Sequence, residues 1–212
     1  MIITYQGVES FRVQFGDYVL AFNPVSKDSK FKSTRFGADI ALISVNNPDM
    51  NGTEQIGYGE KQPLIISGPG EYEVKGIFVR GFESETEYGK EKKINTIYTV
   101  LLEGMNITYL GALSNSTISP KVSSAIGDTD ILFVPIGGDG VLNAVEAYKL
   151  AVKLEAKIII PMHYGSLGDK DALKIFCKEG SSDGLKPVDK LTLKKKDFEG
   201  KNGDIVIFEE NK

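Results

Sequence analysis

Histidine and cysteine each occur once in this chain of 212 residues, as His163 and Cys177. A single cysteine excludes an intrachain disulfide and a zinc site made of several cysteines. Cys177 follows Ala172 and Phe176 in residues 171–178, a run with helical spacing of apolar side chains. We interpret it as a small buried side chain, because a nucleophilic cysteine needs a basic partner and only one histidine is present.

The chain also lacks an excess of basic residues and any long apolar run. Its net charge of −4 argues against general nucleic-acid binding, which requires a concentrated basic face. The cluster Lys194–Lys196 is interpreted as the solvated edge of a strand. No run approaches the roughly 20 apolar residues of a membrane span, and no signal peptide opens the chain, because Gln6 and Glu9 follow the first apolar residues. We expect a cytoplasmic protein with no nucleic-acid and no membrane partner.

Short β-branched and aromatic runs fill the first half of the chain, separated by glycine and proline turns. The residues from 81 to 95 carry many glutamates and lysines and are expected to form an exposed loop. Glycine 76 is expected to mark a bulge inside the strand 71–80. The predicted strands are residues 2–5, 10–15, 18–22, 39–44, 63–66, 71–80, 97–103 and 105–110.

Helices and strands alternate in the second half. Ser119 before Pro120, and Asn143 three residues before Glu146, are typical helix N-termini. The predicted strands are residues 130–135, 156–160, 191–193 and 205–208, and a third helix is expected between residues 169 and 180. This order predicts one α/β domain, residues 1–212, with two packed sheets and helices outside.

The residues AKIIIPMHYG (156–165) hold the only histidine. The apolar run is too short for a helix and predicts a buried strand, which Pro161 is expected to end because it lacks an N–H. His163 would then stand at the carboxyl end of that strand, a common place for a metal or acid–base site.

Five stretches, in this order, resemble the metallo-β-lactamase fold superfamily, and most closely its small prokaryotic branch related to L-ascorbate-6-phosphate lactonase. They are YQGVESF (5–11), GPGEYEVKG (68–76), NTIY (95–98), PIGG (135–138) and IPMHY (160–164). The resemblance implies a four-layer αβ/βα sandwich. It also implies a hydrolytic site along one edge, where strand-end loops converge on one or two metal ions.

Most metal ligands implied by this resemblance are replaced here. Only Asp49, from the H-x-H-x-D-H loop after residues 39–44, and His163 remain. The expected histidine in residues 81–95 falls at Thr86, or at Glu85 if the loop is shorter. The other replaced positions are Val8, Asn23, Val45, Asn47, Met50 and Ala112.

A catalytic zinc ion needs about three protein ligands plus water. One histidine and one carboxylate do not meet that need. The leading hypothesis is therefore a metal-free pseudoenzyme without a cofactor that binds an unknown protein or small molecule. In that case His163 is expected to bond to Asp49 or to a backbone carbonyl, and Asp49 to remain as a turn residue.

The alternative is a hydrolase with a rebuilt site. Asp49 and His163 would be joined by Glu85, Glu87 or Asp139 around one weakly bound divalent ion, with manganese or magnesium favoured by the oxygen ligands. Because edge strands can pair between copies, a homo-oligomer is a further hypothesis.

Overall fold

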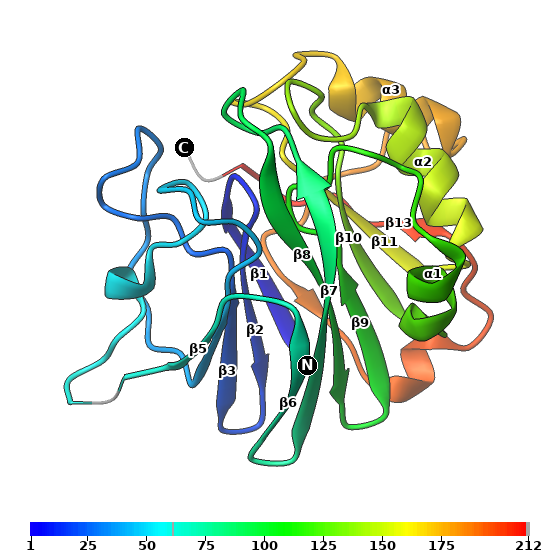
Figure 1. Ribbon diagram of the computed structural model, residues 1–212. Helices are drawn as coiled ribbons and strands as arrows, with labels where there is room; N and C mark the ends of the chain where they lie inside the picture. The colour runs from blue at the N-terminus through cyan, green and yellow to red at the C-terminus, as the bar shows by residue number, and fades with distance from the viewer. Residues whose placement is uncertain (61, 211–212) are drawn as a thin grey trace.

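The computed structural model describes residues 1–60 and 62–210 as two mixed β-sheets packed face to face (Figure 1). Residue 61 and residues 211 and 212, the end of the predicted domain, lie outside the described residues. This arrangement of two sheets with few helices confirms the α/β sandwich expected from the order of elements.

The first sheet has six strands in the order β12-β1-β2-β3-β4-β5. Strands β1 to β3 form an antiparallel meander, and β4 and β5 continue it in parallel. Strand β12, from the C-terminal part of the chain, forms one edge of this sheet by pairing with β1. Next to it, the Met1 amine donates to the carbonyl of Leu193 at 2.9 Å. The strands are β1 (Ile2–Gly7), β2 (Ser10–Phe15), β3 (Tyr18–Phe22), β4 (Ile40–Leu42), β5 (Leu64–Ile66) and β12 (Leu191–Thr192).

The second sheet has seven strands in the order β13-β11-β10-β9-β8-β7-β6. Figure 1 places α1, α2 and α3 together on the outer side of this sheet. The strands are β6 (Gly70–Val74), β7 (Ile77–Thr86), β8 (Lys93–Leu102), β9 (Met105–Tyr109), β10 (Ile131–Pro135), β11 (Ile158–Met162) and β13 (Asp204–Ile205). The helices are α1 (Pro120–Ile126), α2 (Ala144–Lys153) and α3 (Ala172–Glu179), with the short 3₁₀ turns η1 (Thr53–Gln55) and η2 (Lys195–Phe198).

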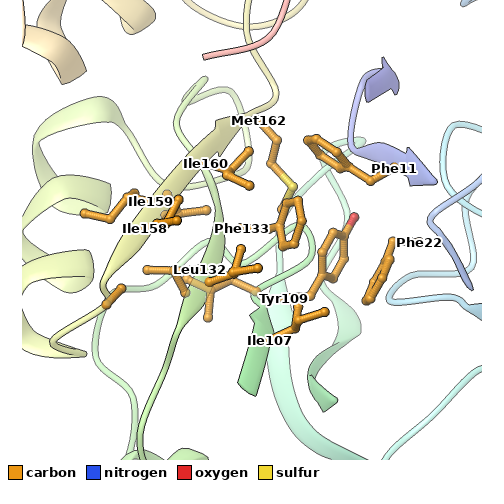
Figure 2. Packing of buried hydrophobic residues seen from close by; sticks show 14 of the residues in the cluster. Phe11, Phe22, Ile107, Tyr109, Leu132, Phe133, Ile158, Ile159, Ile160 and Met162 are labelled. Atoms are coloured by element: carbon orange, nitrogen blue, oxygen red, sulfur yellow. The ribbon is translucent and has the colours of Figure 1, made fainter. Parts of the chain in front are cut away.

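Aromatic side chains from both sheets meet in the core (Figure 2). The Phe11 ring of β2 lies 4.6 Å from the Phe133 ring of β10, measured between centroids. The Phe22 ring of β3 lies 4.9 Å from the Tyr109 ring of β9. Such pairs contribute about 0.5–1.5 kcal/mol beyond the burial of their area, so these contacts help to hold the two sheets together.

Several local predictions are confirmed. The side chain of Ser119 accepts from the N–H of Val122, and that of Asn143 accepts from the N–H of Glu146. Cys177 is buried in α3, and burial raises the pKa of its thiol.

Within the described part of the chain, the structure has no helix with the length and apolarity to span a membrane.

The exposed loop predicted for residues 81–95 is wrong. Strand β7 continues to Thr86 and β8 starts at Lys93, so only residues 87–92 connect them. Glu83 and Glu85 point outward from β7, while Thr86 is buried. The glutamates on the solvated face of the strand resemble the composition of a loop. The alternation of exposed and less exposed residues that marks a strand was therefore not recognised.

The single strand predicted for residues 71–80 is also wrong. The chain reverses between β6 and β7, which pair as an antiparallel hairpin. Lys75 and Gly76 form the turn, with φ of 54° and 77°. Two consecutive residues in the left-handed region are typical of the tight turn that matches the twist of a hairpin, so Gly76 serves a turn instead of a bulge.

Pro161 does not end the strand, contrary to prediction, because β11 runs on to Met162. The main-chain groups of Ile158 and Met162 bond toward β10, so those of Ile159 and Pro161 face β13. The last bond on that side joins Val206 N–H to the Ile159 carbonyl. Strand β13 has then ended, and Pro161 sits where no N–H is required.

The lysine cluster is exposed, as predicted, but it is not in a strand. Lys194 precedes the 3₁₀ turn η2, which contains Lys195 and Lys196. The side chain of Asp197 accepts from the N–H of Lys194 at 2.8 Å. Strand β12 already ends at Thr192, so the cluster lies beyond the sheet.

Candidate functional site

The site is built from loops that follow strands of both sheets. Val8 lies in the turn after β1, Asn23 follows β3, and His163 follows β11. All three have positive φ, at 59°, 41° and 60°. The left-handed conformation costs roughly 1–2 kcal/mol for an ordinary residue, and most for a β-branched one such as Val8. The N–H of His163 donates to the Val8 carbonyl at 2.9 Å, which fixes the two loops to each other.

A buried carboxylate, that of Glu9, organises the polar part of the site. Its Oε1 lies 2.8 Å from Nδ1 of His163, and its Oε2 accepts from the Asn23 amide at 3.1 Å. The same amide donates to the Ser44 hydroxyl at 2.8 Å, and the Tyr109 hydroxyl donates to the Glu9 carbonyl at 2.7 Å. The side chains of Glu9 and His163 are 0% and 1% exposed. These bonds satisfy a carboxylate that would otherwise be very costly to bury.

The partner of His163 differs from the prediction. Its ring bonds to Glu9, and neither Asp49 nor a backbone carbonyl takes that place. An imidazole held at Nδ1 by a carboxylate presents Nε2 on its other side, as metal-binding histidines commonly do. The carboxylate contact that orients a metal-binding histidine is therefore present at Nδ1 of His163. No periodicity in the sequence singled out Glu9, because its partner lies 154 residues further along the chain.

Apolar packing occupies the centre of the site. Val45, Met50 and Ala112 are at most 1% exposed and form one cluster with Val141, against which Tyr88 packs. The first three are positions where the resemblance implies metal ligands. Their side chains offer no useful donor to zinc and fill the space with carbon and a thioether sulfur.

Tyr88 separates the two donors that remain. Its hydroxyl donates to Asp49 Oδ2 at 2.7 Å, and its ring meets the His163 ring edge-on, with centroids 5.1 Å apart. Burial, together with the Asp49 carboxylate, raises the pKa of the Tyr88 hydroxyl. Ser29 donates to the other oxygen of Asp49. Sequence reasoning missed Tyr88, because it lies among the charged residues that were interpreted as exposed.

Asp49 is more than a turn residue, since it connects Ser29 to Tyr88. The Asn47 side chain instead caps the local turn by accepting from the N–H of Asp49 at 2.9 Å. Thr86 has a similar local role, with its hydroxyl accepting from the N–H of Tyr88 at 3.1 Å. Asn47 and Thr86 therefore serve loop structure.

Val8 and Ala112, two further replaced positions, likewise have structural roles. Val8 packs in a second apolar cluster with Val25 and Leu167. The N–H of Ala112 donates to the side chain of Asn95 at 3.0 Å, which holds the loop after β9 in place.

The carboxylates considered for a rebuilt site do not converge on Asp49 and His163. The Glu85 side chain is 71% exposed and lies 4.0 Å from the Lys92 ammonium. Glu87 and Asp139 line an open depression that also contains lysines 90 and 92. Within residues 1–60 and 62–210, no three histidine, cysteine, aspartate or glutamate side chains come together as a metal ion requires.

The residues present do not fit a catalytic zinc ion. Such an ion needs about three nitrogen, oxygen or sulfur ligands around one point. The point between Asp49 and His163 is instead bordered by the ring of Tyr88 and the apolar cluster. We therefore derive no chemical step through a metal at this site.

The fold and the positions of these loops define the class of protein. A family model described as the beta-lactamase superfamily domain matches residues 2–163. The chain therefore belongs to the β-lactamase superfamily, and its sandwich is the metallo-β-lactamase fold.

Within this superfamily, the chain is similar to UPF0173 proteins. One from Pyrococcus abyssi is 34% identical over 177 residues, covering 81% of this chain and 78% of the relative. The UPF0173 metal-dependent hydrolase YtkL of Bacillus subtilis is 26% identical over 198 residues, covering 78% of this chain and 86% of the relative. A Thermotoga maritima structure, named as a candidate Zn-dependent hydrolase, superposes with a TM-score of 0.77 at 26% identity and covers 99% of both chains.

Proposed function

We propose that this chain is a metal-free, catalytically inactive member of the superfamily that acts as a binding or assembly protein. One observation carries the proposal. Val45, Met50 and Ala112, which stand where ligands are implied, are packed together as a single apolar cluster.

Physical chemistry explains why such a fold remains stable without metal. Buried charges and imidazoles at these positions would be costly once no ion paired with them. Replacing such groups with well-packed apolar side chains is often neutral or stabilising. The remaining imidazole, His163, is bonded to Glu9, and the remaining carboxylate, Asp49, to Ser29 and Tyr88. The sandwich is then available as a scaffold whose surfaces bind partners.

Metal analysis tests the first part of this proposal. We expect protein purified without chelators to contain zinc, manganese and iron at well below one equivalent per chain, measured by plasma mass spectrometry. Dialysis against a chelator should leave the melting temperature unchanged, because no metal contributes to stability. A near-stoichiometric content of any of these metals, or a large loss of stability on chelation, would contradict the proposal.

The retained Glu9–His163 pair favours one second candidate, a hydrolase that uses a weakly bound divalent ion near Asp49. Because the sequence resembles the branch related to L-ascorbate-6-phosphate lactonase, its substrate class would be a lactone. The test is lactone hydrolysis with added Mn²⁺, Mg²⁺ or Zn²⁺, comparing the wild type with His163→Ala and Asp49→Asn. Metal-dependent turnover that both substitutions abolish would establish this candidate, and turnover that survives them would belong to a contaminant.

A further inference from the structure

Strand β5 forms one edge of the first sheet and pairs only with β4. The N–H of Leu64 donates to the Asp39 carbonyl, and the Ile66 carbonyl accepts from the N–H of Ile43, both at 2.9 Å. Main-chain groups alternate in direction along a strand, so the N–H and carbonyl of Ile65 point away from β4. The open edge thus presents one donor and one acceptor at Ile65.

Apolar side chains surround this edge. Leu64 is 48% exposed, Ile65 is 49% exposed and Tyr58, in the preceding loop, is 77% exposed. Tyr58 lies against Gly37, near the end of the sheet where the parallel strands β4 and β5 begin. Residues 62–70 contain no charged side chain. Natural edge strands are usually protected by charges, and this one is not.

The other edges are protected. Strand β6 carries the exposed glutamates 71 and 73. If β6 paired with itself about Tyr72, each Glu71 would face a Glu73, and like charges directly opposite are destabilising. Strands β12 and β13 are only two residues long. Among the edges that the structure describes, β5 is the one suited to pairing.

We propose that β5 pairs antiparallel with β5 of a second copy, about a two-fold axis at Ile65. The two Ile65 residues would then exchange both of their free main-chain hydrogen bonds. The N–H of Ser67 would reach the carbonyl of the partner subunit's Pro63. Pro63 itself has no N–H to donate, so the ladder ends there. Two six-stranded sheets become one continuous sheet across the dimer.

A second copy suits this surface for two reasons. Self-pairing of an uncharged strand places no like charges opposite each other, and it buries the exposed side chains of Leu64 and Ile65 on both copies at once. A contact through three-residue strands is small, so we expect a reversible dimer whose population depends on concentration. The inference goes beyond the proposed function and does not depend on it, since a chain that bound zinc could still dimerise through β5.

Sedimentation equilibrium of the full chain across a range of concentrations tests the dimer. We expect a monomer–dimer equilibrium in the wild type and a dissociation constant at least tenfold higher for Ile65→Lys, which places two like charges at the two-fold axis. Ile65→Pro, which removes the outward N–H without adding a charge, should also weaken the dimer. Val152→Lys is the matched control, because Val152 is 55% exposed on α2, away from this edge.

Hydrogen exchange gives a second measure that does not depend on the variants. The Ile65 amide should become more protected as concentration rises, while exposed amides of α2 do not change. Melting curves of each variant establish that the chain is folded. A protein that stays monomeric at every concentration overturns the inference, as does a dimer that Ile65→Lys leaves intact.

Discussion

Replacing Glu9 with alanine is expected to lower the free energy of unfolding by about 3 kcal/mol or more. The substitution removes the carboxylate that accepts from Asn23 and bonds to Nδ1 of His163. A buried donor left without a partner costs about 1–3 kcal/mol. The cavity left by the side chain adds to this cost, because such a tightly packed interior collapses only partly.

Urea denaturation followed by circular dichroism measures this loss. Glu87→Ala is the control, because Glu87 is an exposed glutamate of the loop between β7 and β8, and its removal should change the stability by less than about 0.5 kcal/mol. The stability of Glu9→Gln should fall between those of Glu9→Ala and Glu87→Ala. The glutamine amide keeps the side-chain volume and one acceptor, but its NH₂ group would face either the donating NH₂ group of Asn23 or Nδ1 of His163. Equal stabilities of Glu9→Ala and Glu87→Ala would show that the buried network contributes nothing.

Introducing Met50→His together with Ala112→Asp is expected to make stability depend on zinc. Without metal, the two buried polar groups should cost about 2–5 kcal/mol, because they replace apolar side chains that are fully buried. With zinc, they would join Asp49 and His163 as a set of four donors, the number typical of a zinc site. Zinc at one hundred times its dissociation constant then restores about 2.7 kcal/mol.

Melting temperatures with and without zinc, together with calorimetric titration, check this result. The wild type should show no change in melting temperature with zinc and no heat of zinc binding. Asp49→Asn in the double variant should weaken zinc binding. Because Tyr88 lies between Asp49 and His163, adding Tyr88→Ala should tighten binding further. A double variant that is indifferent to zinc, with and without Tyr88→Ala, would show that these positions do not surround a common point.

Strands with strong apolar patterns were predictable from sequence, and so was the order of strands and helices along the chain. The run before His163 is buried on both faces, so it consists of consecutive β-branched residues and needs no knowledge of its neighbours. The resemblance located the loops of the site, because its motifs lie at strand ends. The hairpin of β7 and β8 was missed, since the glutamates of its solvated face resemble the composition of a loop.

The partners within the site were not predictable in the same way. Glu9 and His163 are far apart in sequence, and no local rule indicates that a glutamate after a valine is buried. Tyr88 fills a space that exists only when the loops after β4, β7 and β11 are brought together. Loss of ligands can therefore be inferred one position at a time, whereas the packing that replaces them depends on the assembled fold.

The pairing of β1 with β12 has a consequence for how the protein is made. Strand β1 finds its outer neighbour only when residues 191 and 192 have been synthesised. The parallel partner β13 of the second sheet comes later still, at residues 204 and 205. The nascent chain thus carries an open β1 edge while residues 8 to 190 are being synthesised. Chaperones that shield exposed strands would act during this interval.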